Sequence, residues 1–266
     1  MSEELINKVL AEVVKKMGGD APTPSAAPAP TPAAGALPAV TEFVGTNVLG
    51  DTIGMVIANV DPKLRAMMKL EKDFRSIGIL GARTGAGPHI FAADEAVKAT
   101  NSEILTIELP RDTKGGAGHG SLIIFGAEDV SDARRAVEVS LGELDRTFGD
   151  VYGNDAGHLE FQYTARASYA LNKAFGAPIG KAFGITVGAP AGIGVVLADT
   201  AVKAATVDVI GYASPAGGTS YSNEVISFLS GDSGAVRQAI IAAREVGIPL
   251  LGALGAKPES TTTPYI

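Results

Sequence analysis

The residues with the clearest chemical potential form a glycine-rich loop at 81–88, Gly-Ala-Arg-Thr-Gly-Ala-Gly-Pro. The loop follows an expected strand and precedes an expected helix, a position where backbone N–H groups can cradle a phosphate. It lacks the Lys-Ser/Thr pair of a P-loop and the full G-x-G-x-x-G spacing. Glu108, at the end of the next expected strand, stands about where an acid could bind a ribose. The loop therefore permits a nucleotide site or, more simply, tight turns and close packing of subunits.

Candidate catalytic side chains are few. The chain has three histidines, His89, His119 and His158. His158 stands near Asp155 and Glu160, a grouping that we interpret as a surface cluster rather than as a catalytic base. The sequence has no G-x-S-x-G nucleophile elbow, no H-E-x-x-H motif and no cysteine. We therefore expect no catalytic set, no metal site and no cofactor.

The composition predicts a folded chain and argues against several classes of binding and membrane protein. Of the 266 residues, 46 % are hydrophobic and 19 % are charged, which is typical of a folded chain. A net charge of −7 argues against binding to nucleic acid or to an anionic membrane. The longest uncharged apolar stretch, 182–198, is interrupted by glycine and proline, so we expect no membrane-spanning helix. The acidic N-terminus does not resemble a signal peptide.

The N-terminal region differs from the rest of the chain. Residues 1–17 carry apolar side chains at helical spacing and predict an amphipathic helix. Residues 21–40 contain six prolines and eight alanines, which predicts a semi-stiff extended linker. The folded part is expected to begin near Thr41.

An internal repeat is the most informative feature of the folded part. Ala-Asp-Glu-Ala-Val-Lys-Ala at 93–99 returns as Ala-Asp-Thr-Ala-Val-Lys-Ala at 198–204. Arg-Arg-Ala-Val at 134–137 similarly matches Arg-Gln-Ala-Ile at 237–240. Because the matches keep their order and nearly their offset, we expect two related domains, 41–150 and 151–266, after an N-terminal segment 1–40.

Each domain is expected to alternate strands and helices without a strict βαβ pattern, which predicts an α/β fold with a mixed or antiparallel sheet. Asp61 is the expected N-cap of a helix that has Pro62 at its first position. The expected strands are 52–58, 76–80, 104–108, 122–125, 159–163, 183–187, 208–212 and 225–229. The expected helices are 62–74, 89–100, 130–146, 166–175, 194–205 and 233–246.

These motifs resemble a known family. The repeated A-D-x-A-V-K-A signature, followed by an apolar strand, resembles the shell domain of bacterial microcompartments. The stretch 230–237, Ser-Gly-Asp-Ser-Gly-Ala-Val-Arg, is similar to the G-D-x-G-A-V-[KR] stretch of that domain. Two such units, each starting with a strand and a helix before the signature, resemble circularly permuted tandem-domain shell proteins. Residues 41–45, 69–72, 75–89, 108–120 and 162–170 resemble the propanediol-utilisation type.

The resemblance implies an α/β fold of two tandem, circularly permuted microcompartment domains, assembled as a trimer whose six domains imitate a hexagon. It implies a shell tile in the bacterial cytoplasm, which is not an enzyme. The expected partners are further copies of the chain, other shell proteins, the enclosed enzyme core, and small diols or alcohols in transit.

The resemblance also assigns residues. The tile-edge lysine of the family corresponds to Lys98 and Lys203, and the apolar stripe of the first helix, Leu5, Val9 and Val13, is expected to tether the enzyme core. The two glycine-rich hairpin loops correspond to the pore-lining region. Their expected pore residues are Glu108, Pro110, Arg111, Asp112, Thr113, Lys114, Gly115, Gly116, His119, Ser214, Pro215, Gly217, Gly218 and Thr219.

Overall fold

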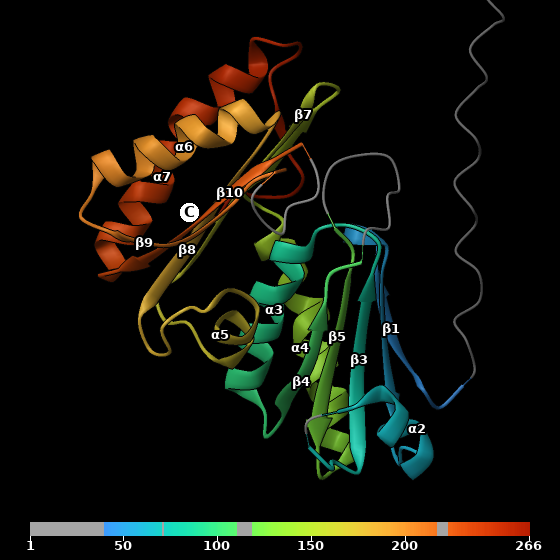
Figure 1. The fold of residues 1–266 in the computed structure, drawn as a ribbon. Helices are drawn as coiled ribbons and strands as arrows, with labels where there is room; N and C mark the ends of the chain where they lie inside the picture. The colour runs from blue at the N-terminus through green and yellow to red at the C-terminus, as the bar shows by residue number, and fades with distance from the viewer. Residues whose placement is uncertain (1–39, 71, 111–118, 217–222) are drawn as a thin grey trace, which may run out of the picture. The chain divides into compact units, whose positions relative to one another are not determined.

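The computed structural model describes residues 40–70, 72–110, 119–216 and 223–266. The expected helix at 1–17 and the linker up to residue 39 lie outside these residues, as do the central parts of both glycine-rich loops. All the described elements belong to one compact unit, Val40–Ile266. This unit contains two separate antiparallel sheets (Figure 1).

The first sheet is formed by residues 43–127, and α4 packs against strands β1 to β3. Its strands lie in the order β1-β2-β3-β5-β4, and each neighbouring pair is antiparallel. In chain order the elements are β1 (Phe43–Asn47), the 3-10 turn η1 (Leu49–Asp51), β2 (Thr52–Ile57), α2 (Pro62–Met68), β3 (Ser76–Ala82), α3 (Ala86–Ala99), β4 (Glu103–Glu108), β5 (Ser121–Ala127) and α4 (Val130–Thr147).

The second sheet repeats this arrangement. Its order is β11-β6-β7-β8-β10-β9, which is the order of the first sheet with one short strand added, and it is antiparallel throughout. Its elements are β6 (Val151–Asn154), β7 (Gly157–Thr164), α5 (Tyr169–Phe175), β8 (Ala182–Ala189), α6 (Ala191–Ala204), β9 (Asp208–Ala213), β10 (Val225–Gly231), α7 (Ser233–Gly252) and β11 (Glu259–Ser260). The internal sequence repeat therefore corresponds to two copies of the same strand and helix arrangement.

The helix ends follow local signals in part. Asp61 caps α2 as expected, since its carboxylate accepts from the N–H groups of Lys63 at 2.8 Å and Leu64 at 3.2 Å. The helix ends at Met68 rather than at residue 74, because Lys69 adopts a left-handed conformation with φ 52°. Helices α3 and α6 each begin three residues earlier than expected. Within the described residues, no helix combines the length and apolar character needed to cross a membrane.

The two halves are joined by aromatic packing. Phe91 of α3 stacks on Phe183 of β8, with ring centroids 5.9 Å apart. Phe175 of α5 stacks in turn on Phe183 at 6.0 Å and on Phe228 of β10 at 5.0 Å. Because Phe91 belongs to the first half and the other three rings to the second, this stack makes one apolar core across the boundary.

A buried carboxylate reinforces the same joint. The side chain of Asp94 on α3 is 1 % exposed. It accepts from the N–H groups of Ser168 at 3.0 Å and Leu171 at 3.2 Å, at the start of α5. Lys98 Nζ lies 2.9 Å from the same carboxylate. A carboxylate of the first half thus satisfies N–H groups at the start of a helix in the second half.

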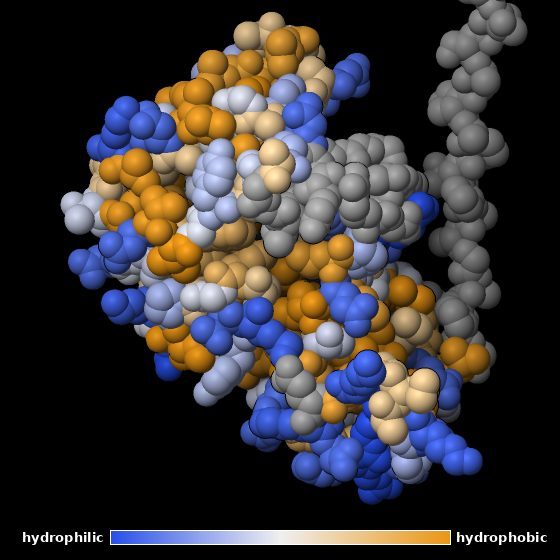
Figure 2. Space-filling model, in the orientation of Figure 1, coloured by the Kyte–Doolittle hydropathy of each residue, from blue (hydrophilic) through white to orange (hydrophobic). Residues whose placement is uncertain are grey.

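Apolar side chains of the second half also remain at the surface. Figure 2 shows hydrophobic residues gathered over α6 and the neighbouring strand. The large exposed residues of α6 and β9 are Val195, Val196, Val202, Val209, Ile210 and Tyr212.

Candidate functional site

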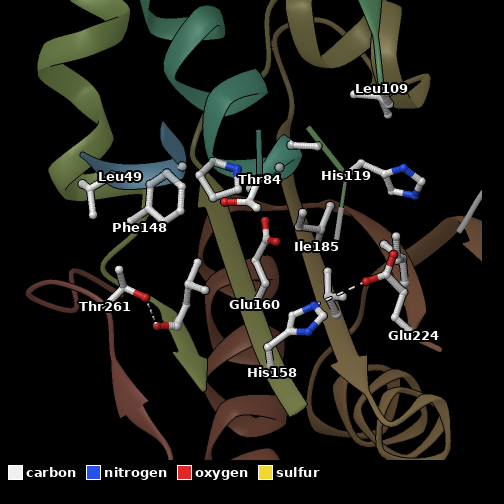
Figure 3. A pocket seen from close by; sticks show the side chains of 18 of the residues that line it. Leu49, Thr84, Leu109, His119, Phe148, His158, Glu160, Ile185, Glu224 and Thr261 are labelled. Atoms are coloured by element: carbon white, nitrogen blue, oxygen red, sulfur yellow. Dashed lines mark hydrogen bonds and ion pairs between the residues drawn. The ribbon is translucent and has the colours of Figure 1, made fainter. Parts of the chain in front are cut away.

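A pocket of about 370 Å³ lies between the two halves of the chain. The first half contributes η1, residues 84–88 at the start of α3, and Phe148. The second half contributes strands β7, β8 and β10 (Figure 3). Its apolar wall is formed by Leu49, Phe148, Ile185, Val187, Ile226 and Phe228. The pocket is therefore built by the same packing that joins the halves.

Among the described residues, four titratable side chains line this pocket. His158 and Glu160 come from β7, and strand alternation places both on one face of it. Glu224 precedes β10, and its Oε2 lies 3.3 Å from His158 Nε2 (Figure 3). His119 comes from the end of the first glycine-rich loop. The described residues contain no group of three or more acids and histidines arranged to hold a metal ion.

Glu160 has the most unusual environment of the four. Its side chain points into the space below the start of α3 (Figure 3), and its Oε1 has no hydrogen-bond partner within the described part of the chain. Burial, and after it the nearby charge of Glu224, raise the pKa of Glu160 to about 8, against a smaller opposing effect of a hydrogen bond with Gln162. The carboxyl group is therefore mostly protonated at neutral pH. It can then donate as well as accept a hydrogen bond, which suits a neutral hydroxyl group.

The glycine-rich loop at 81–88 serves packing in this structure. A Cβ on Gly87 would lie 1.9 Å from Glu160 Oε1 and 3.2 Å from Ile185 Cδ1. A Cβ on Gly85, whose φ is +83°, would lie 2.4 Å from the ring of Phe148. Glu160 thus fills the place at the helix start where a phosphate would be cradled. The geometry supports the packing interpretation of these glycines and disfavours the nucleotide site.

The two predicted edge lysines lie in different settings. Lys98 Nζ is 2.9 Å from both Asp94 and Glu95 and 3.5 Å from Thr164 Oγ1 of the second half, and its side chain is 25 % exposed. Lys203 Nζ lies 2.6 Å from the carboxylate of Asp199, and its side chain is 73 % exposed. Equivalent positions in the repeat are therefore not equivalent in their surroundings.

The predicted pore residues are described only in part. Of those that are described, Glu108, Pro110, Ser214 and Pro215 do not line the pocket, whereas His119 does. Backbone hydrogen bonds fix the base of the first loop, from Gly120 N to Pro110 O at 2.8 Å and from Ala86 N to His119 O at 3.2 Å. The remaining predicted residues lie outside the described part of the chain: Leu5, Val9, Val13, Arg111, Asp112, Thr113, Lys114, Gly115, Gly116, Gly217, Gly218 and Thr219.

The interpretation of His158 and Glu160 as a surface cluster is wrong. Glu160 is buried, and His158 pairs with Glu224 rather than with Asp155. A signal was present in the sequence, because His158, Glu160 and Gln162 alternate along one strand and place three polar side chains on one face. Glu224 carries no such signal, since it precedes β10 in an irregular segment.

Comparison with known proteins places the chain in a family. The family model described as "BMC domain" matches residues 76–154 and 182–255, one match in each half. The bacterial microcompartment shell protein PduB of Citrobacter freundii is 62 % identical over all of this chain and 99 % of its own length. The PduB protein of Salmonella typhimurium is 63 % identical over the same shares.

Solved structures agree with this result. A crystal structure of a trimeric bacterial microcompartment shell protein PduB matches with a TM-score of 0.83 and 54 % identity, covering 85 % of this chain and 100 % of that one. EtuB from Clostridium kluyveri matches with a TM-score of 0.82 and 57 % identity, covering 86 % and 100 %. The chain therefore belongs to the BMC-domain family of bacterial microcompartment shell proteins.

Proposed function

We propose that three copies of this chain form a ring that serves as one tile of a microcompartment shell of the propanediol-utilisation type. The observation that carries the proposal is the repeated strand order of the two sheets, since three copies then supply six similar domains. The similar PduB structure is described as trimeric, which supports the same number. The partners of the tile are other shell proteins, and no catalytic step is assigned to the chain.

We extend the proposal to metabolite passage at the pocket between the halves. Protonated Glu160, the His158–Glu224 pair and the apolar wall suit a small neutral molecule with hydroxyl groups, such as a diol or an alcohol. His119 links this pocket to the first glycine-rich loop, which the family resemblance assigns to the pore.

The proposed role of the N-terminal segment rests on its sequence. The stripe of Leu5, Val9 and Val13 would dock on an enclosed enzyme as an amphipathic helix. The linker of six prolines would supply reach, at roughly 3.1 Å for each extended residue. Removing residues 1–39 is expected to leave rings and shells intact while the enzymes are lost from purified shells. Shells that keep their full enzyme content would contradict the tether.

The tile itself is tested by light scattering and electron microscopy. We expect a particle of three times the 27.0 kDa chain mass that grows into flat sheets. Because Lys98 and Lys203 are the proposed edge residues, the double variant Lys98→Ala, Lys203→Ala should keep the ring but form no sheets. Lys257→Ala, at an exposed position near the C-terminus, is the matched control. A stable single-chain particle at micromolar concentration would refute the ring.

The pocket is tested by saturation-transfer NMR with 1,2-propanediol as the probe. Glu160→Gln keeps a donor and an acceptor and should retain the signal, whereas Glu160→Val should lose it. Equal signals from the two variants would remove Glu160 from the proposed site.

A further inference from the structure

Residues 259–266, which we call the strap, are an addition to the repeated fold. In the first half, helix α4 leads directly into β6, whereas after α7 the chain turns back along the segment 145–154 that connects the two halves. The strap begins with β11, which pairs with β6 and places Glu259 opposite Gly153 and Ser260 opposite Tyr152. The repeat therefore accounts for the two sheets but not for the strap.

Asp150 anchors the far end of the strap. Its carboxylate is buried and accepts from the N–H groups of Tyr265 at 2.9 Å and Ile266 at 3.0 Å. Arg244 of α7 lies 2.6 Å from the same carboxylate and donates to the carbonyl oxygen of Ile266 at 2.7 Å. A buried charge needs hydrogen-bond partners, so the strap satisfies part of the need of Asp150.

The side chain of Tyr265 fastens the strap to both halves. Its hydroxyl group donates to the carbonyl oxygen of Tyr163 at 2.9 Å and accepts from the Tyr163 N–H at 3.2 Å. The guanidinium group of Arg146 lies over the Tyr265 ring, 4.9 Å from its centroid. Arg146 belongs to α4 of the first half and Tyr163 to β7 of the second, so one side chain of the strap contacts both.

The near end of the strap is part of the pocket wall. Thr261 lines the pocket, and its N–H and hydroxyl groups donate to the carbonyl oxygen of Val151 at 2.9 and 3.2 Å (Figure 3). Ser260 Oγ donates to the carbonyl oxygen of Gly149 at 2.6 Å. Phe148 and Val151 line the pocket as well. The strap therefore holds the segment that supplies two further residues of the wall.

From these contacts we infer that the strap controls access to the pocket. While the strap is anchored, the wall formed by Phe148, Val151 and Thr261 is closed, and release of the strap opens the pocket on that side. The inference rests on the proposed passage of metabolites at this pocket and adds the element that regulates it. Asp150 and Tyr265 are then positioning residues, which act on the pocket through the strap.

The strap can leave its place without unfolding of the core. Each of its residues is exposed or half-buried, and its strand β11 spans only Glu259–Ser260. Segments with few buried apolar contacts open at a lower free energy than the core does. Hydrogen exchange of the wild type, measured by mass spectrometry, should show peptides 148–154 and 259–266 exchanging together and faster than β8. Exchange of these peptides at the rate of β8 would overturn the inference.

The accessibility of an introduced cysteine measures opening of the pocket, because the natural chain has no cysteine. Ile185→Cys places a thiol in the pocket, at a residue that is 2 % exposed. Ile124→Cys is the matched control, because Ile124 is also 2 % exposed but belongs to a core cluster of the first sheet. Labelling by iodoacetamide under native conditions gives the rate at each position.

Replacement of Tyr265 then tests the control of access. Tyr265→Ala should raise the labelling rate at position 185 by roughly tenfold or more and leave the rate at position 124 unchanged, because only the strap is loosened. Tyr265→Phe, which loses the hydroxyl group alone, should give a smaller increase. Thr263→Ala, at an exposed position of the strap, should leave both rates at their wild-type values. Asp150→Asn weakens the anchor independently and should act as Tyr265→Ala does.

The outcomes separate this inference from the proposed passage. Equal increases at positions 185 and 124 would show that Tyr265 stabilises the whole chain, and would overturn the control of access, as would an unchanged rate at position 185. If the strap variants open position 185 but the wild type gives no saturation-transfer signal with 1,2-propanediol, the strap controls the pocket and the passage of diols is refuted. If the signal is present and position 185 does not respond, the passage stands and the role of the strap is wrong.

Discussion

The two copies of the A-D-x-A-V-K-A motif occupy the same place in the repeat and have opposite environments. Asp94 is buried and accepts from two N–H groups of the second half in addition to Lys98. The side chain of Asp199 is 57 % exposed and pairs with Lys203. Both motifs form the same local Asp–Lys pair at i and i+4. The motif therefore determines the local Asp–Lys pair. Whether the pair is buried depends on the element that packs on it, which for Asp94 is α5.

The largest expected difference between the halves concerns this motif. Asp94→Ala leaves the N–H groups of Ser168 and Leu171 without an acceptor, and should lower the free energy of unfolding by about 2–4 kcal/mol. Asp199→Ala removes an exposed pair and should change it by less than about 1 kcal/mol. Urea unfolding at equal chain concentration measures both. Equal losses in the two variants would show that the joint does not depend on the buried carboxylate.

A second difference between the halves concerns the pH dependence of stability, because the second half contributes the buried acid Glu160. The pKa of Glu160 rises from 4.5 to about 8 on folding. Between these values the folded protein holds a proton that the unfolded chain has released, so stability falls as the pH rises, by at most about 1.4 kcal/mol per pH unit. The Glu160→Gln variant should not show this loss. Its stability relative to that of the wild type should therefore increase from pH 5 to pH 8.

Thermal unfolding across this pH range, with exposed Glu138→Gln as the control, measures the effect of Glu160. The control should follow the wild type. A Glu160→Gln variant whose difference from the wild type is constant with pH would show that Glu160 is ionised in the folded protein.

The glycines that begin α3 and α6 offer a matched pair. Gly87→Ala places a methyl group against Glu160 and Ile185 and should cost about 1–3 kcal/mol. Its repeat equivalent, Gly192, has nothing within 4 Å of a built Cβ, so Gly192→Ala should stabilise by up to about 1 kcal/mol. Differential scanning calorimetry of the two variants compares them directly. A destabilising Gly192→Ala would reveal a contact that the single chain lacks.

The smallest expected effect concerns the ends of α2 and α5. Lys69 adopts a left-handed conformation that favours glycine, so Lys69→Gly should stabilise by about 0.5–1 kcal/mol. Gly176→Ala, at the equivalent position with open space around it, should destabilise by about 1 kcal/mol through the backbone alone. Chemical unfolding of both variants tests the equivalence. Effects of the same sign would break the alignment of α2 with α5.

Local features of the fold could be predicted from the sequence. Asp61 with Pro62 predicted the start of α2, and the expected helix end at residue 175 matches the end of α5, where Gly176 adopts a left-handed conformation. The short strands β1 and β6 were missed, since four or five residues carry little periodicity. The early starts of α3 and α6 were also missed, because the first turns of these helices contain Gly87 and Gly192, and glycine has a low helix propensity.

The candidate site was less predictable because it depends on contacts between the halves. Glu160 and Gly87 are 73 positions apart in the sequence, and only the packing of β7 against the start of α3 brings them together. The strand pattern of His158, Glu160 and Gln162 could have indicated one polar face. Nothing in that pattern shows that the face is closed by the other half.

The carboxylate of Asp94 also has a consequence for the order in which the chain is made. Its N–H partner on Leu171 is 77 residues later in the sequence. At about 5–20 residues per second, the ribosome takes roughly 4–15 seconds to supply that partner. During this interval the emerging first half carries an uncovered face, and Asp94 has its local partner Lys98 but not yet the N–H groups of α5. Completion of the joint between the halves is therefore timed by translation of the second half.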